Sequence, residues 1–270
     1  MSSQIHNEPI DGEVSALSRG LTVLRVIGDS PFPLTLKEIS DGAGIPKATT
    51  SRLLNTLLTS GLVRRLPESE RYGMGPGVMA LSQSYLAKLD IRAESRSHMR
   101  SFAEATGVTV HLGTRDRLEM VLLETVRPMS AALVMRIGVG NRLGLATSAS
   151  GRAYLAALPD EEREQLIHSL RVSMEGDWPN IAARLDIALA QYRAEGFVTS
   201  YGEWHPDVNA IAVPIVMPDG EIYSLNCGGA AFKFTAERLT EDISVRLLAC
   251  MDAIRCATGG TIPSQALTCE

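Results

Sequence analysis

Residues 36–65 read Leu36-Lys-Glu-Ile-Ser-Asp-Gly-Ala-Gly-Ile-Pro-Lys-Ala-Thr-Thr-Ser-Arg-Leu-Leu-Asn-Thr-Leu-Leu-Thr-Ser-Gly-Leu-Val-Arg-Arg65. A short amphipathic segment at the start of this stretch ends at Gly42 and Gly44, residues that favour a turn. Pro46 then opens a second segment, because its fixed φ suits the start of a helix and its missing N–H is not needed there. Leucines recur at helical spacing along the second segment, from Leu53 to Leu58. The pattern predicts a helix, a turn and a second helix.

The second of these helices carries a set of hydrogen-bond donors away from its apolar side. These residues are Lys47, Thr49, Thr50, Ser51, Arg52 and Asn55. Side chains of these types can reach phosphates and base edges in the major groove of DNA. We therefore interpret the segment as a DNA recognition helix. The alternative is the polar, solvated face of an ordinary three-helix domain.

The charge of this stretch differs from that of the whole chain. The chain carries a net charge of −5, which argues against a protein that coats nucleic acid indiscriminately. Residues 42–67, in contrast, contain four basic side chains and no acidic one. A basic face confined to one segment of an acidic protein favours a reader of specific DNA sequences.

A hairpin is predicted directly after the recognition helix. Residues 62–66 and 71–74 have strand-like composition, and Pro67-Glu-Ser-Glu70 forms a turn between them. Basic side chains on this wing could contact the phosphate backbone of DNA. A basic side chain on the helix that begins at Ser15 could do the same. These candidates are Arg64, Arg65, Arg71 and Arg19. The alternative is a solvated hairpin whose arginines are ordinary surface residues.

Length and composition indicate a two-domain globular protein. The chain has 270 residues, of which 45% are hydrophobic and 21% charged, and chains of this length usually form two domains. It has no apolar run long enough to span a membrane and no secretion signal at its start, so we expect it in the cytoplasm. Its four cysteines form no C-x-x-C pair, so we expect reduced thiols, no metal site and no other cofactor.

The rest of the chain predicts a linker and a second domain of mixed helices and strands. We expect a flexible tail over residues 1–13, a DNA-binding domain over 14–76, a linker helix over 77–90, the second domain over 91–258 and another tail over 259–270. Strands of the second domain are predicted at 108–112, 119–126, 131–137, 197–201, 209–217 and 221–227. Helices are predicted up to residue 107 and at 147–158, 160–170, 180–195 and 236–256, with a glycine-rich turn at 138–145.

The start of one predicted helix is a candidate anion site. Thr147-Ser-Ala-Ser-Gly151 places hydroxyls and small residues directly before an apolar run, which is typical of a helix N-terminus. The free backbone amides at such an end point outward with a partial positive charge, so an organic carboxylate is a natural guest. The alternative is ordinary N-capping without a ligand.

Two stretches raise the alternative of a small-molecule enzyme with a vestigial helix-turn-helix domain. Glu203-Trp-His-Pro-Asp207 brings two carboxylates and a histidine within five residues, and Ser148 and Ser150 are candidate nucleophiles. A nucleophile elbow requires Gly-x-Ser-x-Gly, and neither serine has the leading glycine. We therefore assign no catalytic residue and expect a protein that is not an enzyme.

The order of these motifs resembles the IclR family of bacterial transcription regulators over nearly the whole chain. The resemblance is carried by Ala16-Leu-Ser-Arg-Gly-Leu-Thr-Val-Leu24, Ile45-Pro-Lys-Ala-Thr-Thr-Ser-Arg-Leu-Leu-Asn-Thr-Leu57, Gly61-Leu-Val63, Tyr72-Gly-Met-Gly75, Thr106-Gly107, Val139-Gly-Asn-Arg-Leu143, Ser150-Gly-Arg-Ala-Tyr-Leu-Ala156 and Ile211-Ala-Val-Pro-Ile215. It implies an α+β architecture: a winged helix-turn-helix, a linker helix and a GAF-like effector domain with a curved antiparallel sheet flanked by helices. It also implies a homodimer or a dimer of dimers that binds double-stranded operator DNA in the bacterial cytoplasm, as repressor or activator.

The resemblance further implies effector contacts on the loop at 147–151, on the loop before it and on the facing strands. Matching positions in this chain are Leu143, Ala149, Ser150, Ser200, Val208, Ala210, Asn226 and Gly228, with Met135 as an apolar wall. Ser200 and Asn226 offer neutral hydrogen bonds and the others are apolar or small, which suits a small or aromatic acid better than a sugar phosphate. We hypothesise that the effector is a small organic acid, aromatic acids included, from a catabolic pathway.

Overall fold

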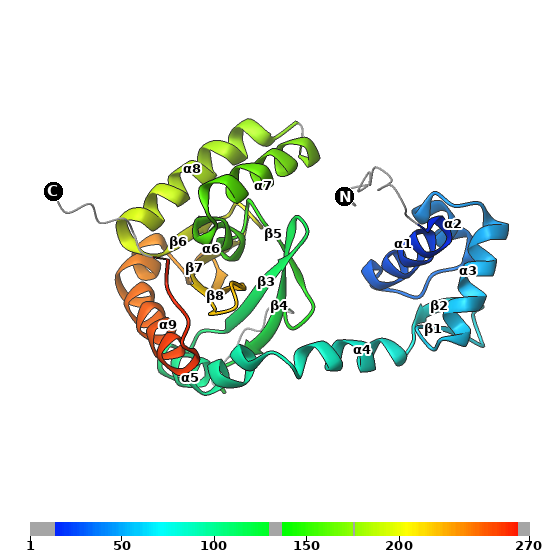
Figure 1. The fold of residues 1–270 in the computed structure, drawn as a ribbon, viewed down its shortest axis with the longest axis horizontal. Helices are drawn as coiled ribbons and strands as arrows, with labels where there is room; N and C mark the ends of the chain where they lie inside the picture. Colours follow the sequence, from blue (N-terminus) through cyan, green and yellow to red (C-terminus); the bar gives the residue numbers. More distant parts are fainter. Residues whose placement is uncertain (1–13, 130–136, 175, 264–270) are drawn as a thin grey trace. The chain divides into compact units, whose positions relative to one another are not determined.

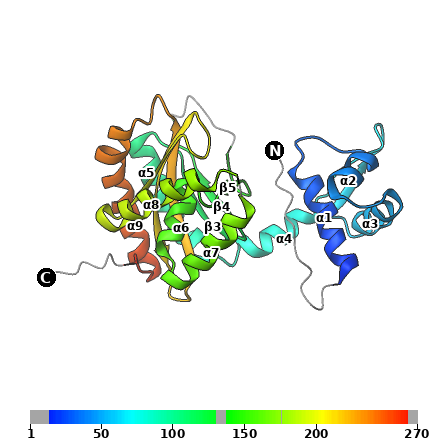
Figure 2. The same cartoon turned by 90° about the horizontal axis from the view of Figure 1, so that it is seen from above.

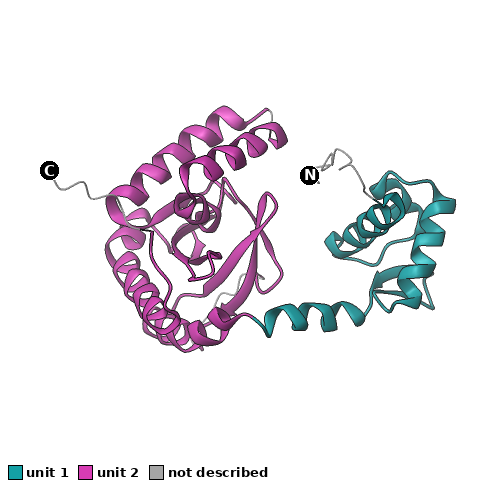
Figure 3. Cartoon of the chain, in the orientation of Figure 1, with its two compact units in different colours: residues 1–88 teal, residues 89–270 magenta. Residues whose placement is uncertain are grey.

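The protein divides into two compact units, residues 1–88 and residues 89–270 (Figure 3). The computed structural model describes residues 14–129, 137–174 and 176–263. The strand predicted at 131–137 coincides almost entirely with residues outside these ranges. Within them, no helix is both long enough and apolar enough to cross a membrane.

Unit 1 is a three-helix domain with a β-hairpin wing and a fourth helix after it (Figure 1). Its helices are α1 (Ser15–Asp29), α2 (Leu36–Ala43), α3 (Lys47–Thr59) and α4 (Gly77–Leu86), and its wing pairs β1 (Val63–Leu66) with β2 (Arg71–Met74). The core of the domain contains Val23, Ile27, Ile39, Ile45, Leu54, Leu57 and Val63. The predicted winged helix-turn-helix is therefore confirmed.

Local signals set the turn between α2 and α3. Helix α2 begins with a capping box, in which the Glu38 backbone N–H donates to Thr35 Oγ1 at 3.3 Å and the Thr35 N–H donates to the Glu38 carboxylate at 2.7 Å. It ends at Gly44, whose φ of 64° lies in the left-handed region that favours glycine. Helix α3 then starts directly after Pro46.

Unit 2 is built on a curled, six-stranded antiparallel sheet. Its strands are β3 (Val110–Asp116), β4 (Glu119–Val126), β5 (Arg142–Gly144), β6 (Val198–Tyr201), β7 (Val208–Val216) and β8 (Ile222–Ala230). Across the sheet they follow the order β5-β4-β3-β8-β7-β6. The two central strands are therefore β3 and β8, the first and the last strand of this sheet in the sequence, which pair side by side (Figure 1).

Strand β5 corrects the sequence prediction, which expected only a glycine-rich turn at 138–145. Residues 142–144 pair antiparallel with β4, with Leu143 opposite Met120. The Arg142 guanidinium also bridges the carboxylates of Asp116 and Glu119 from the neighbouring hairpin. A three-residue edge strand that ends in a glycine is too short to show an alternating pattern in the sequence. It is held in place by its pairing with β4 and by this ion-pair bridge.

Helices cover both faces of this sheet. Helix α6 (Ala149–Ala157) packs on β6, β7 and β8, and α7 (Asp160–Ser173) and α8 (Trp178–Glu195) follow it in the chain. Helices α5 (Asp90–Thr106) and α9 (Ser244–Thr258) pack against each other and cover the opposite face (Figure 2). Strand β8 alternates accordingly, since Ser224 contacts α6 whereas Cys227 lies next to Cys250 of α9.

The end of the described chain differs from the predicted helix and tail. The predicted helix at 236–256 starts with a π-helical segment, Arg238–Ile243, and continues as α9 to Thr258. After α9, Thr261 forms a β-bridge with Val216, and the Tyr192 hydroxyl donates to the Pro263 carbonyl at 3.2 Å. Residues 259–263 are therefore held against the sheet domain.

Candidate functional site

Helix α3 presents two basic side chains without internal partners. Lys47, Arg52 and Asn55 are exposed, and Thr49 and Ser51 are half-buried. Among the described residues, neither Lys47 nor Arg52 forms an ion pair or a side-chain hydrogen bond. Both cations are therefore available to an external anion such as a DNA phosphate or to a base edge.

Thr50 is a correction to the predicted set of DNA contacts. Its side chain is 0% exposed, and its hydroxyl donates back to the carbonyls of Ile45 and Pro46, each at 3.2 Å. Position 50 faces the core of the domain, next to the turn that precedes α3. Thr50 therefore fixes the start of the recognition helix and does not face DNA.

The wing arginines differ in whether they are bonded to other residues of the domain. Arg64 is exposed and forms no ion pair with a described residue, whereas Arg65 pairs with Glu70 at 2.6 Å on the surface. Arg71 donates to the Pro33 carbonyl at 2.9 Å and to Glu38 at 3.2 Å, so it holds the wing against the start of α2. We therefore retain Arg64 and Arg65 as candidates, together with the exposed Arg19 on α1, and regard Arg71 as structural.

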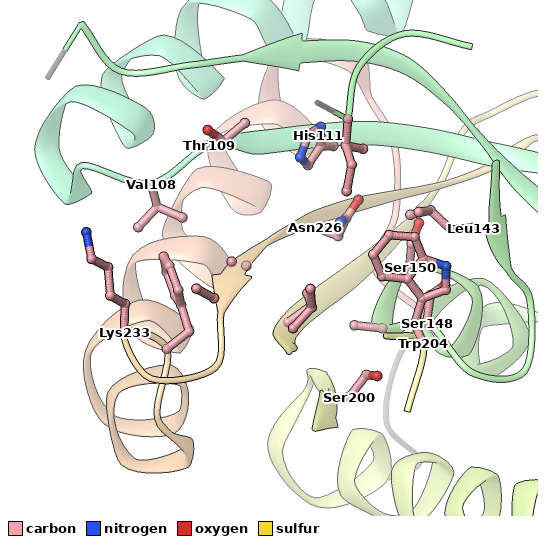
Figure 4. Close-up of a pocket in the computed structure, with 18 of the residues that line it drawn as sticks. Val108, Thr109, His111, Leu143, Ser148, Ser150, Ser200, Trp204, Asn226 and Lys233 are labelled. Carbon is pink, nitrogen blue, oxygen red and sulfur yellow. The ribbon is translucent and has the colours of Figure 1, made fainter. Parts of the chain in front are cut away.

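A single cavity of about 360 Å³ in unit 2 brings together eight of the nine expected effector residues (Figure 4). They are Leu143, Ala149, Ser150, Ser200, Val208, Ala210, Asn226 and Gly228. The ninth, Met135, lies outside the described residues. The volume is typical of a site for a small molecule.

One side of the cavity is the N-terminus of α6. The Ser148 hydroxyl caps this helix by accepting the Gly151 N–H at 3.1 Å. The amides of Ala149 and Ser150 belong to the first turn, where the helix offers no carbonyl to accept them, and both residues line the cavity. A Cβ at Gly151 would lie 2.1 Å from the Leu145 carbonyl oxygen, so only glycine lets the helix start this close to the preceding loop. The helix end can therefore stabilise an anion in the cavity.

Two serine hydroxyls on the cavity wall are already bonded within the protein. The Ser150 and Ser224 hydroxyls lie 2.5 Å apart and connect α6 to β8. The Ser200 hydroxyl donates to the Thr147 carbonyl at 2.8 Å and connects β6 to the loop before α6. These serines therefore hold the wall in place, and Ser200 retains only its accepting lone pairs for a ligand.

His111 and Asn226 are neighbours on the sheet that forms the floor of the cavity. They are register partners on β3 and β8, and sequence reasoning had assigned His111 no role. The His111 Nδ1 lies 3.0 Å from the Thr125 hydroxyl. Burial, with a smaller effect of Arg127, lowers the pKa of His111 from its usual 6.5 to about 4, so the ring is neutral near pH 7.

Two cations line the cavity, and Figure 4 shows the first of them, Lys233, on the opposite side from Trp204. They are Lys233 and Arg238 on the segment after β8. The Arg238 guanidinium donates to the Lys233 carbonyl at 3.0 Å and lies over the Phe234 ring, 4.9 Å from its centroid. The described lining residues include no Asp or Glu. The cavity therefore has a positive electrostatic balance that favours an anionic guest.

The stretch 203–207, which raised the enzyme alternative, is occupied by structural contacts. The Glu203 carboxylate pairs with Arg152 at 2.5 Å and with Arg184 at 3.2 Å. His205 is exposed, and its Nδ1 accepts the Asp207 N–H at 3.3 Å. No group of three or more potential metal ligands occurs among the described residues. Among the described residues, the Glu203 carboxylate and one ring nitrogen of His205 are thus used in structural contacts.

The two units therefore combine a winged helix-turn-helix with a sheet domain that encloses a small-molecule cavity, an arrangement that defines a ligand-responsive DNA-binding regulator. Residues 16–67 match the family model described as the IclR helix-turn-helix domain, and residues 83–256 match that of the bacterial transcriptional regulator IclR C-terminal domain. The chain belongs to the IclR family of transcriptional regulators. It is a DNA-binding regulator with an effector-binding domain.

Individual relatives agree with this family. The HTH-type transcriptional regulator TsaQ1/TsaQ2 of Comamonas testosteroni is 32% identical over 87% of this chain and 85% of its own length. The crystal structure of an IclR family regulator from Brucella abortus is 37% identical, with a TM-score of 0.83 over 94% of this chain and 96% of that one. An IclR homologue from Microbacterium hydrocarbonoxydans, complexed with 4-hydroxybenzoate, is 22% identical and shares the fold, with a TM-score of 0.71 over 91% and 99% of the two chains. The named relatives are transcriptional regulators and not enzymes, so they do not support the alternative of a small-molecule enzyme.

Proposed function

We propose that this regulator senses a small organic acid, aromatic acids included, in the cavity of unit 2. The observation that carries the proposal is the electrostatic balance of the cavity. The first turn of α6, Lys233 and Arg238 all favour an anion, and the described wall contains no carboxylate that would repel one. The Microbacterium homologue is complexed with 4-hydroxybenzoate, and we carry this class of ligand over to the present chain.

The DNA-binding part of the proposal assigns the contacts to α3 and the wing. Lys47, Arg52 and Asn55 would face the major groove, and Arg64 would reach the phosphate backbone beside it. A homodimer would place two recognition helices about one turn of DNA apart, roughly 34 Å, or a multiple of that distance. A dimer of dimers would occupy two such sites.

Effector binding would act by shifting the population between arrangements of the DNA-binding domains. We keep the expected division into a DNA-binding domain (14–76), a linker (77–90) and an effector domain (91–258) as part of the proposal, with the correction that the linker helix α4 ends at Leu86 and does not continue to residue 90. The linker helix connects the two domains along the chain and would transmit the change. The protein would act in the bacterial cytoplasm, where operator DNA and products of catabolism meet.

Two measurements test this function together. A thermal-shift screen of the full chain against organic acids should find a stabilising acid, with about 2.7 kcal/mol expected at a hundred times the dissociation constant. The uncharged amide or alcohol of the same acid is the control and should stabilise much less. Footprinting of the DNA upstream of its own and neighbouring genes should show a protected site that changes when the acid is added. A screen in which no acid stabilises the chain would refute acid sensing and leave DNA binding to be judged by the footprint.

A further inference from the structure

An unpartnered amide distinguishes the floor of the effector cavity from its other walls. Asn226 is 6% exposed, and its Oδ1 has no hydrogen-bond partner in the described part of the chain. Among the described residues, two other buried side-chain atoms lack a hydrogen bond, Arg152 Nη2 and Glu124 Oε2, and the latter is ion-paired with Arg92 at 3.0 Å; neither belongs to the cavity lining. Buried polar groups are normally hydrogen-bonded, so an exception inside a ligand cavity calls for a partner that arrives with the ligand.

The described residues around Asn226 offer it no internal partner. Figure 4 shows its amide projecting from β8 between His111 and Ser150. Ser150 is bonded to Ser224 at 2.5 Å, and the His111 Nδ1 is 3.0 Å from Thr125. The second ring nitrogen of His111 makes no hydrogen bond with a described residue. His111 and Asn226 therefore both line the cavity floor with an unused hydrogen-bonding atom.

The chemistry of the amide determines the kind of ligand group that suits it. An amide presents an acceptor and two donors side by side, and its terminal torsion is soft, so either end can turn toward the cavity. A neutral imidazole likewise offers one donor and one acceptor nitrogen. A hydroxyl both donates and accepts, so it satisfies Asn226 in either orientation and His111 in either tautomer. A methyl or a hydrogen atom at the same place satisfies neither residue.

The position of Asn226 relative to α6 sets the layout of the ligand. Ser224, which contacts Ser150 in the first turn of α6, lies two residues from Asn226 on the same face of β8. Two residues along a strand span roughly 7 Å. If the carboxylate of a ligand binds at the α6 N-terminus, the ligand group that reaches Asn226 must lie several bonds from that carboxylate.

We propose that the effector is a hydroxy acid, whose hydroxyl is separated from the carboxylate and is bound by Asn226 with His111 beside it. This inference rests on the acid-sensing function proposed above and adds the second functional group of the ligand. It makes Asn226 the residue that selects hydroxylated acids over their unsubstituted analogues.

Matched ligands test the proposal on the unmodified full chain. We would measure binding of 4-hydroxybenzoate and 3-hydroxybenzoate against benzoate, and of 4-hydroxyphenylacetate against phenylacetate, by calorimetry. In at least one pair the hydroxylated acid should bind about tenfold more tightly or better. The 4-methoxybenzoate ion, which accepts but cannot donate a hydrogen bond and is larger, should bind more weakly than 4-hydroxybenzoate.

A pair of variants assigns the selectivity to its residue. Asn226→Leu keeps the branching of the side chain but makes it apolar and somewhat larger, and it should reduce the affinity ratio within the selective pair to about one. Asn180→Ala, at an exposed asparagine of α8, should leave the ratio unchanged. Acids that bind equally with and without the hydroxyl would overturn the hydroxyl inference alone. Failure of every acid to bind would overturn the proposed function and this inference with it.

Discussion

Arg152 and Glu203 form a buried ion pair, with Arg152 Nη1 2.5 Å from Glu203 Oε2. The Arg152 side chain is 3% exposed, and its Nε and Nη1 also donate to the carbonyls of Ala146 and Thr199, each at 3.0 Å. One guanidinium therefore connects helix α6, the loop before it, strand β6 and the loop after β6. Burial lowers the pKa of Arg152, with Glu203 acting in the opposite direction.

Removing the charge of Glu203 should destabilise unit 2 strongly. Glu203→Gln leaves the Arg152 charge buried and unpaired, which should cost about 3 to 5 kcal/mol of unfolding free energy. Denaturant unfolding followed by tryptophan fluorescence measures this, because both tryptophans, Trp178 and Trp204, lie in unit 2. The control is Arg184→Gln, which removes the exposed partner of the same carboxylate and should cost less than about 1 kcal/mol. If the two variants lowered the unfolding free energy equally, the Arg152–Glu203 pair would not be the more important of the two ion pairs of Glu203.

His111 should make the stability of unit 2 depend on pH. Its pKa is about 4 in the folded chain against 6.5 when exposed, so the unfolded state takes up the proton first as the pH falls. Stability should therefore be highest above pH 6.5 and should decrease by up to about 3 kcal/mol as the pH approaches 4. In His111→Gln this component should be missing from unfolding curves recorded between pH 4 and pH 7. Parallel profiles for the variant and the unmodified protein would show that His111 does not carry the effect.

Two neighbouring positions of helix α3 should affect DNA binding in different ways. Arg52→Ala removes an exposed, unpaired cation and should weaken binding to operator DNA by about 1 to 3 kcal/mol if it contacts a base, with less effect on scrambled DNA. Thr50→Val keeps the shape of the buried side chain but removes its hydroxyl. It should lower the stability of unit 1 by about 1 kcal/mol and leave the sequence preference unchanged. Gel shifts with both DNAs and thermal unfolding separate the two outcomes, and unchanged binding of Arg52→Ala would remove this residue from the DNA-binding face.

Lys233 should contribute to acid binding through its charge. Lys233→Gln keeps a polar side chain at the cavity but removes the cation, so acids should bind about two- to tenfold more weakly. The loss should shrink as salt is added, because the exposed charge is screened. Lys88→Gln changes an exposed lysine away from the cavity lining and serves as the control. Equal acid affinity in the two variants would exclude a role for the charge of Lys233.

The winged helix-turn-helix and most of the sheet were predictable because their signals are local. Gly44, Pro46 and the leucine spacing of α3 define the turn and its helices, and alternation of apolar residues defines the longer strands. Thr50 shows the limit of this reasoning. Thr50 lies four residues before Leu54 and seven before Leu57, on the buried side of α3, and the tight turn at Ile45 supplies carbonyls that accept from its hydroxyl, so a polar side chain here does not mark an exposed position.

The cavity could be predicted only in part. Positions such as Ser150 and Asn226 followed from the family resemblance, whereas His111, Lys233 and Arg238 did not. His111 joins the site through the pairing of β3 with β8, more than a hundred residues later in the chain. Nothing in the local pattern of a lone histidine on a strand reveals such a partner. Lys233 stands in the turn after β8 and Arg238 at the start of the helical segment that follows, and only the fold brings both to the cavity.

The small residues of the cavity wall differ in how they can change during evolution. Ala149 and Ala210 already carry a Cβ, and both residues line the cavity. A Cβ at Gly228 would lie 2.4 Å from the Asn209 carbonyl oxygen, and at Gly151 the Leu145 carbonyl is closer still. Positions 151 and 228 have no room for any side chain, so the backbone that frames the cavity is fixed at these two points while the residues between them can vary.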